Sequence, residues 1–247
     1  MIRLREVTKI YDTGGVQLRA LDGVSLEIER GEFVAIMGQS GSGKSTMMNI
    51  IGMLDRPTSG AYQLLDQDVS QLSEQARARL RGSAFGFVFQ SYSLLPRLSA
   101  LEQVELPLIY QGGANRRRRA AAALVRVGLA DRIRHGPTEL SGGEQQRVAI
   151  ARSLVVEPLV LLADEPTGAL DTATSAEVLA LLSELVQEQG LTIVLVTHEQ
   201  EIADYAYRTI RMRDGQIIED APNSPHPNPA PANDNAQDPV LVEEAQS

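Results

Sequence analysis

A glycine-rich segment near the start of the chain has the residues and spacing of a phosphate-binding loop. Residues 38–45 read Gly-Gln-Ser-Gly-Ser-Gly-Lys-Ser and fit the pattern G-x-x-x-x-G-K-[ST] throughout. The apolar run before it (33–37) predicts a buried strand, and residues 46–51 predict a helix. Glycine lets backbone N–H groups turn toward a phosphate, and the helix N-terminus adds the positive end of its dipole. The segment therefore predicts a site for a phosphorylated ligand.

Individual side chains of this loop have expected roles. Lys44 would reach the β- and γ-phosphates, and the Ser45 hydroxyl would ligate Mg²⁺. Thr46 stands where a dinucleotide-binding G-x-G-x-x-G would need its last glycine, which disfavours that fold. The residues expected to hold the nucleotide are Gly38, Ser40, Gly41, Ser42, Gly43, Lys44, Ser45 and Thr46.

Lysine is rare in this chain. Only Lys9 and Lys44 occur among its 23 basic residues. A compact ammonium on a flexible stem suits a place between two phosphates better than a planar guanidinium does. That explains Lys44, whereas the sequence offers no explanation for Lys9.

Two adjacent carboxylates follow a second buried strand at residues 159–163. Acids at the carboxyl end of a parallel strand lie where α/β folds bind ligands. We expect Asp164 to hold Mg²⁺ and Glu165 to polarise the attacking water as a general base. Acids at strand ends also cap the next segment, and only the phosphate loop favours the catalytic interpretation here.

Further motifs resemble those of the ATP-binding cassette (ABC) ATPases. Residues 140–147, Leu-Ser-Gly-Gly-Glu-Gln-Gln-Arg, are similar to the signature motif of that family, with Glu144 where glutamine is usual. The resemblance covers residues 1–219. The other matching features, in chain order, are Tyr11 where an aromatic ring would stack on adenine, Gln90 after the strand-like residues 85–89, the D-loop-like residues 168–171, and His198 after the apolar residues 192–196.

The resemblance implies a head-to-tail homodimer that encloses two ATP–Mg²⁺ between its subunits. Ser141 and Gly143 of one subunit would face the ATP site of the other, and Gly142 and Asp171 are also implied to bind the nucleotide. Ser141-x-x-Glu144 is also a capping box, so the serine has a local role as well. The implied catalytic residues are Glu165, His198 and Gln90, and the implied magnesium ligands are Ser45, Gln90 and Asp164.

The apolar pattern predicts an α/β fold. Continuous apolar runs predict central parallel strands, and alternation in residues 2–4 and 24–28 predicts half-buried antiparallel strands. The capping box that begins at Ser99 opens a helical region. The resemblance accordingly implies an ABC-type P-loop NTPase with a mixed-sheet RecA-like core, an antiparallel β subdomain and an inserted helical subdomain at about residues 92–157.

A change in composition marks the end of the expected domain. We expect the ABC ATPase domain to span residues 1–220. Residues 221–247 are rich in Pro, Asn and Ala and contain neither Lys nor Arg. Such a segment buries too little apolar surface to offset its ordering entropy, so we expect a disordered acidic tail.

Composition also narrows the function. The 247 residues carry a net charge of −9 and no cysteine. The acidic charge disfavours nucleic-acid binding, and the lack of cysteine excludes disulfides and thiolate chemistry. No apolar stretch approaches the roughly 20 residues of a spanning helix, so we expect a soluble body.

Residues 48–60, 85–90 and 163–171 resemble the MacB/LolD/FtsE-like branch of the family. This implies a peripheral ATPase on the cytoplasmic face of the inner membrane that drives a separate FtsX/MacB-type permease, exporting or releasing a lipoprotein, peptide or macrolide. Residues 90–96 are the expected groove for the coupling helix of that permease. An FtsE-like role in cell division is the alternative.

Other classes of protein share some of these motifs. A DNA-repair ATPase would place a long coiled coil between Lys44 and Ser141, and a translation ATPase would carry two cassettes. A small-molecule kinase has no use for a signature motif.

Four consecutive arginines, Arg116–Arg119, stand at a predicted helix start, where positive charge opposes the helix dipole. Charge runs usually form a solvated face. The sharper alternative is contact with anionic headgroups or with an acidic permease segment.

Overall fold

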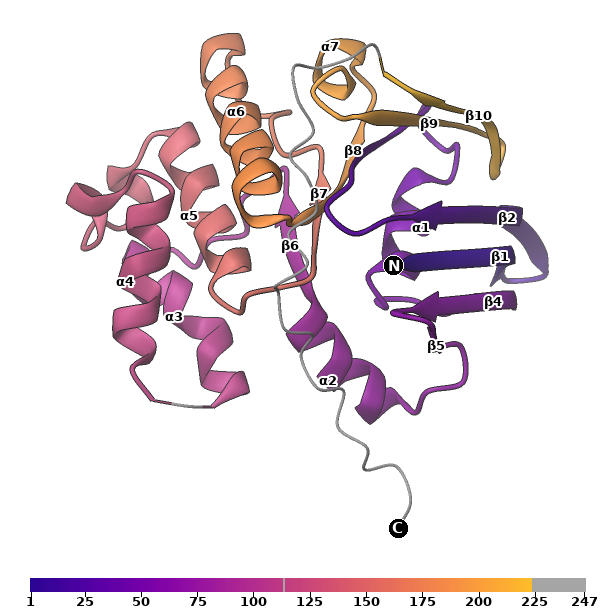
Figure 1. The fold of residues 1–247 in the computed structure, drawn as a ribbon, viewed down its shortest axis with the longest axis horizontal. Coiled ribbons are helices and arrows are strands. Elements are labelled where there is room, and N and C mark those ends of the chain that lie inside the picture. Colours follow the sequence, from indigo (N-terminus) through magenta and orange to yellow (C-terminus); the bar gives the residue numbers. More distant parts are fainter. Residues whose placement is uncertain (113, 224–247) are drawn as a thin grey trace.

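In the computed structural model, residues 1–112 and 114–223 are described. They form two sheets with helices packed around them (Figure 1). Most of the tail predicted from residue 221 onward lies outside the described residues. Among the described helices, none is long and apolar enough to cross a bilayer.

The central sheet has six strands in the order β10-β9-β3-β8-β7-β6. Strands β9, β3, β8, β7 and β6 run parallel, and β10 pairs antiparallel with β9, which confirms the mixed sheet. The strands are β3 (Phe33–Met37), β6 (Phe85–Phe89), β7 (Val160–Asp164), β8 (Thr192–Thr197), β9 (Arg208–Arg213) and β10 (Gln216–Pro222).

Burial on both faces of this sheet explains its continuous apolar runs. Phe33 and Ala35 of β3 pack into a core shared with helices on one side, while Val34 and Ile36 pack into a second core on the other side. Parallel strands covered on both faces need apolar residues at every position.

The second sheet is antiparallel, with the strand order β2-β1-β4-β5. Its strands are β1 (Ile2–Thr13), β2 (Val16–Ile28), β4 (Ser59–Leu64) and β5 (Gln67–Asp68). Ile2 pairs with Ile28, and Leu4 with Leu26, so the alternating apolar residues share one buried face. That face packs with helix α1 (Lys44–Ile51) in the second core.

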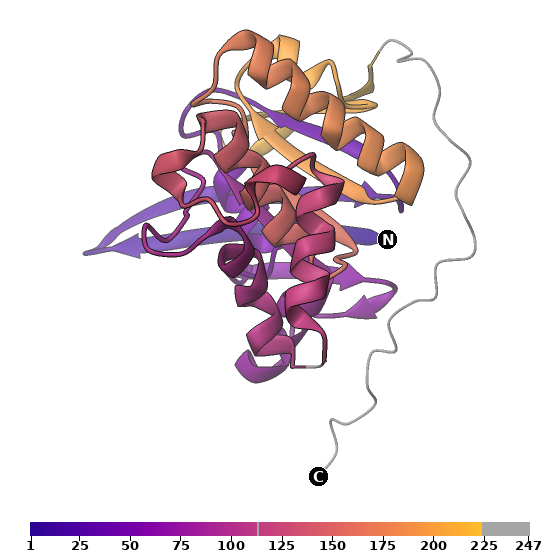
Figure 2. The same cartoon turned by 90° about the vertical axis from the view of Figure 1, so that its left-hand side faces the viewer.

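Helices α3 (Ala100–Gln111), α4 (Arg116–Arg126) and α5 (Gly142–Leu154) form the predicted helical subdomain, at the left of Figure 1 and toward the viewer in Figure 2. Short 3₁₀ turns at Ala130–Arg132 and Pro137–Glu139 connect α4 to α5. The Ser99 and Ser141 capping boxes are both present. The remaining helices are α2 (Glu74–Ala84), α6 (Thr172–Gln189) and α7 (Gln200–Ala203).

The folded chain continues past the expected boundary at residue 220. Strand β10 extends to Pro222, where proline is tolerated because β10 is an edge strand. The Asn223 amide then donates to the carbonyl oxygens of Ala203 (2.9 Å) and Ala206 (2.7 Å). These bonds keep residues 221–223 in the domain although their composition resembles that of the tail.

Candidate nucleotide-binding site

The phosphate loop connects β3 to α1 and lies tightly against neighbouring backbone. A Cβ on Gly38 would lie 2.4 Å from the Met212 carbonyl oxygen. Gly43 has a φ of 103°, and a Cβ there would lie 2.6 Å from the Ala20 carbonyl oxygen. Both positions therefore require glycine, one because of β9 and the other because of β2.

The Lys44 side chain is buried at the mouth of the loop, with 8% of the residue exposed. Its ammonium donates to the carbonyl oxygens of Gly38 (2.8 Å) and Gln39 (2.9 Å). These are neutral acceptors, and phosphate oxygens would bind the ammonium more strongly. The lysine is thus already held where a phosphate would meet it.

The phosphate loop and the acidic pair line one cleft of about 690 Å³. The parallel strands β3, β7 and β8 end at the same edge of the sheet, which brings Lys44, Asp164 and His198 together although they are far apart in sequence. The predicted residues that line this cleft are Gly38, Ser40, Gly41, Lys44, Ser45, Asp164, Glu165 and His198.

Gln90 reaches the same edge from β6. It lines an adjoining cavity of about 560 Å³ together with Ser45, Asp164 and Glu165. Its amide packs against Gly168, where a Cβ would lie 2.6 Å from the amide nitrogen. The structure thus brings the three expected magnesium ligands to one cavity.

The donor set suits Mg²⁺, which prefers hard oxygen ligands such as hydroxyl, amide carbonyl and carboxylate oxygens. Burial raises the pKa of Asp164, and the negative charge of Glu165 raises it further, while Lys44 partly opposes the shift. A buried carboxylate beside a second carboxylate is stabilised in its charged form by a nearby cation.

Glu165 and His198 lie in direct contact. The Nδ1 atom of His198 lies 2.8 Å from Oε1 of Glu165, so a proton on Nδ1 would be donated to the carboxylate. The backbone N–H of Glu165 donates to the Val196 carbonyl (2.9 Å), which fixes the residue to the end of β8. The first contact therefore orients the carboxylate, and the second fixes the backbone that carries it.

The signature segment caps α5. Ser141 accepts from the backbone N–H of Glu144 (3.2 Å), and the Glu144 carboxylate accepts from that of Ser141 (2.8 Å). The bond from Ser141, followed by one from Arg132, lowers the pKa of Glu144. Neither cavity described above is lined by a signature residue.

The signature glycines pack within their own chain. A Cβ on Gly143 would lie 2.3 Å from Cγ2 of Thr174, and one on Gly142 would lie 3.0 Å from the Tyr92 hydroxyl. Asp171 caps α6 by accepting from the backbone N–H of Thr174 (3.0 Å). The signature and the D-loop-like segment therefore support each other at one surface.

Tyr11 has a partner that the sequence did not indicate. Its hydroxyl donates to Oδ2 of Asp55 (2.8 Å), and the other oxygen of that carboxylate accepts from the Lys9 ammonium (2.6 Å). The Lys9 ammonium also donates to the Arg56 carbonyl (2.9 Å) and lies 4.8 Å from the centroid of the Tyr11 ring. The second lysine thus fixes a ring beside the α1 helix.

The Asp55 carboxylate is stabilised in its charged form by its contacts with Lys9 and Tyr11. Burial raises the pKa of Asp55, but the bonds from Lys9, Tyr11 and the Arg56 backbone outweigh it, so the pKa lies below its usual value. The Lys9 side chain is only 12% exposed. Lys9 therefore contacts the protein side of the Tyr11 ring.

Arg211 is a cleft residue that no sequence motif marks. It lies on β9 opposite Met37 of β3, which places it beside the phosphate loop in the cleft lining. Its guanidinium hydrogen-bonds Gln200 and forms an ion pair with Glu219 (3.0 Å). Only the pairing of β9 with β3 reveals this residue.

Residues 21–168 match the protein-family model described as ABC transporter. The chain belongs to the ABC transporter family. This ABC cassette is 54% identical over 220 residues to the uncharacterized ABC transporter ATP-binding protein YknY of Bacillus subtilis, covering 88% of this chain and 95% of YknY.

The cassette also resembles part of a larger protein. It is 55% identical over 225 residues, 90% of its length, to the macrolide export ATP-binding/permease protein MacB of Hyphomonas neptunium. It spans 35% of that MacB chain. The match supports the MacB-like branch that the sequence indicated.

A solved structure matches the fold. The dimeric post-hydrolysis state of the ATP-binding cassette MJ0796, bound to ADP and Pi, superposes with a TM-score of 0.83 at 44% identity, covering 92% of this cassette and all of MJ0796. The predicted ABC ATPase fold is confirmed, and this cassette is an ATPase by family.

Proposed function

We propose that this cassette binds ATP with Mg²⁺, pairs head-to-tail with a second copy and drives a separate transmembrane permease in export. The observation that carries the proposal is the meeting of the phosphate loop, Asp164, Glu165, Gln90 and His198 at one sheet edge. Support also comes from MJ0796, described as a dimer with ADP and Pi, and from MacB, described as an export ATP-binding/permease protein.

Hydrolysis would follow from this geometry. Lys44 and the loop N–H groups hold the phosphates, and Glu165 takes a proton from the water whose oxygen attacks the γ-phosphorus as the bond to the β-γ bridging oxygen breaks. His198 contacts Oε1 of Glu165, so we assign acceptance of the water proton to Oε2. Mg²⁺, held by Ser45, Gln90 and Asp164, would neutralise phosphate charge.

A second copy would complete the site. Ser141 caps α5, so further N–H groups at the start of that helix can face a phosphate on the partner. The signature residues do not line the cleft of their own chain, which agrees with a role across a dimer interface. Asp171 lies on the same surface, held by Thr174.

Tyr11 would stack on adenine through the ring face opposite Lys9. Replacing Lys9 with Met keeps an unbranched apolar stem but removes the ammonium. We expect ATP to bind up to about tenfold more weakly, because the Tyr11 ring loses the ammonium that holds it in place together with Asp55. Calorimetry of ATP binding measures the change.

Inorganic tripolyphosphate serves as the control ligand for Lys9→Met because it has no base. Its affinity should be the same for the variant and the wild type. An equal loss for both ligands would show that Lys9 acts on the phosphate loop, and would contradict the adenine assignment of Tyr11.

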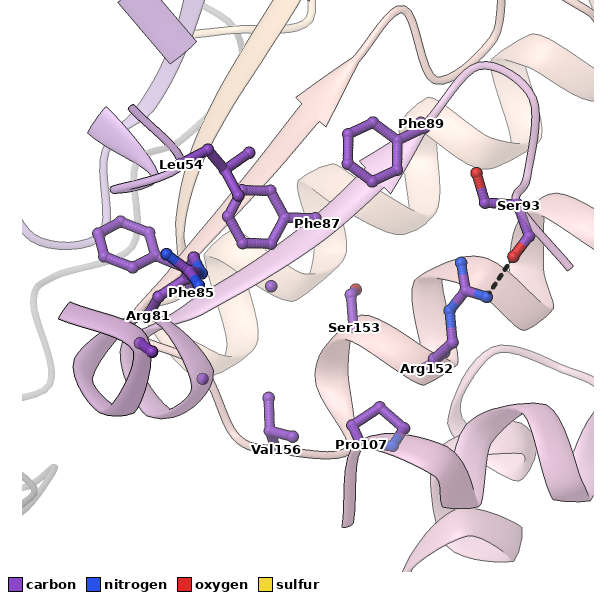
Figure 3. Close-up of a pocket in the computed structure, with 13 residues that line it drawn as sticks. Leu54, Arg81, Phe85, Phe87, Phe89, Ser93, Pro107, Arg152, Ser153 and Val156 are labelled. Atoms are coloured by element: carbon purple, nitrogen blue, oxygen red, sulfur yellow. Dashed lines mark hydrogen bonds between the residues drawn. The ribbon is translucent and has the colours of Figure 1, made fainter. Parts of the chain in front are cut away.

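An apolar groove of about 520 Å³ suits a permease segment (Figure 3). Leu54, Phe87 and Phe89 line one side, and Pro107 and Val156 line the other. The rings of Phe87 and Phe89 are stacked, with their centroids 6.1 Å apart. The groove lies between the central sheet and the helical subdomain, where relative movement of the two parts would reach a bound segment.

The groove differs in detail from the sequence expectation. Of residues 90–96, Ser93 lines it, and the Ser93 carbonyl accepts from Arg152 (2.7 Å). Its apolar walls come mainly from β6, from Pro107 of α3, and from the segments after α1 and after α5. We propose that a permease docked there holds the cassette at the cytoplasmic face of the membrane.

Leu54 offers a test of docking because it is 46% exposed at the groove. Leu54→Glu should abolish co-purification with a membrane permease, since a charge would be buried in an apolar contact. The ATPase activity of the isolated cassette should not change. Leu18→Glu, on β2 and 60% exposed, is the matched control. Co-purification with ribosomes or DNA instead would contradict the transport proposal.

A further inference from the structure

The end of α3 and the start of α4 form an exposed surface that we call the α3–α4 tip, consisting of Ile109, Tyr110 and Arg116–Arg118. Tyr110 is 91% exposed and Ile109 52% exposed. The three arginines are exposed as well. Apolar, aromatic and cationic side chains thus occupy one projecting part of a chain whose net charge is −9.

The arginines do not help the helix that they begin. Asn115, at the start of α4, adopts a left-handed conformation and provides no side-chain cap. Positive charge at that end opposes the helix dipole. Arg116 lies 3.8 Å from Glu105, and the charge of Arg117 helps to lower the pKa of Glu102, so two of the three charges are partly offset from α3, and all three side chains stay exposed. Neither a helix cap nor the helix dipole therefore explains the run.

The tip is fixed beside the groove. Arg119 donates to the Val155 carbonyl (3.0 Å), and Gln111 donates to the Val156 carbonyl (3.4 Å). Val156 and Pro107 of α3 both line the groove. Figures 1 and 2 show α2, the end of α3 and the start of α4 at the same lower end of the molecule.

We propose that the α3–α4 tip contacts anionic phospholipid headgroups. Guanidinium groups bind phosphate in a bidentate manner, and tyrosine favours the membrane–water interface, where its ring is buried and its hydroxyl stays wet. A permease in the groove would direct the tip toward the bilayer. The orientation of the tip toward the bilayer rests on the proposed function. The charge and the exposure of the tip are independent of that function.

Vesicle flotation of the full chain tests the proposal. We expect it to float with vesicles of equal parts phosphatidylglycerol and phosphatidylcholine, less so at high salt, and not with pure phosphatidylcholine. Each basic residue near an anionic surface contributes about fivefold in partitioning, so Arg117→Glu with Arg118→Glu should weaken binding at least about twentyfold. Tyr110→Ser should weaken it less.

The matched control is Arg5→Glu with Arg126→Glu, which changes the net charge equally at exposed positions, one on β1 and one at the far end of α4. It should float like the wild type. Equal loss in the control, or equal binding to neutral vesicles, would overturn the proposal. If the tip variants lost permease co-purification while flotation stayed unchanged, the proposal would also be overturned, because the tip would then contact protein and not lipid. ATPase activity should be normal in every tip variant. A loss of ATPase activity would count against the proposed function and would leave the lipid contact to be judged by flotation.

Discussion

Glu165→Gln is expected to abolish ATP turnover while leaving ATP affinity intact. The amide keeps the shape of the carboxylate and a contact with His198, but it cannot accept a proton from water. A positioned general base contributes about 10²–10⁴-fold to rate, and we expect a loss in that range. Phosphate release measures turnover, and calorimetry measures binding.

The same variant should accumulate as an ATP-bound dimer on size exclusion, because the sandwich forms but is not opened by hydrolysis. Glu188→Gln, an exposed carboxylate near the end of α6, is the matched control and should turn over normally. Wild-type turnover by Glu165→Gln would exclude Glu165 as the base.

Lys44→Ala should weaken ATP binding about 10- to 100-fold, as expected for the loss of charge-assisted bonds to phosphate. The ammonium now bonds the carbonyl oxygens of Gly38 and Gln39 at the edge of the cleft. Removing it leaves those carbonyls accessible to water, so the fold should persist. Calorimetry and circular dichroism measure the two effects separately.

Lys44→Arg separates charge from shape at this position. A planar guanidinium does not fit the tight loop mouth as a compact ammonium does, so arginine should not restore affinity. Unchanged ATP affinity in Lys44→Ala would contradict the assignment of Lys44 to the phosphates.

The structure also suggests how the two halves of a composite site communicate. Gln146 of the signature helix is buried, and its amide donates to the Pro166 carbonyl (2.5 Å), in the turn after Glu165. The helix that would face the partner's nucleotide is thereby tied to the loop that carries the base in its own chain. We expect a displacement of this helix to be transmitted through the Gln146 bond to the turn after Glu165.

The sequence by itself determined the features that depend on near neighbours. The loop at residues 38–45 was predictable because its glycines, lysine and serine are contiguous, and the Ser99 and Ser141 caps because each bond spans three residues. The apolar runs of β3 and β8 were recognisable since every position of a strand covered on both faces is buried.

Composition was less informative at the end of the domain. Residues 221–223 read as tail, yet β10 and the Asn223 amide hold them against β9 and α7. Whether such a segment is ordered depends on the partners that it finds, and composition does not record those partners.

Only the tertiary structure decided which distant residues meet. Arg211 reaches the cleft through the pairing of β9 with β3. The role of Lys9 becomes apparent only in the fold, where the Asp55 carboxylate bonds both Lys9 and Tyr11. The groove likewise combines Leu54, Phe87 and Val156 from three segments that are far apart in the chain. Strand order and packing arise from contacts between residues far apart in the chain, and a local pattern of residue types carries no information about which distant segment will complete it.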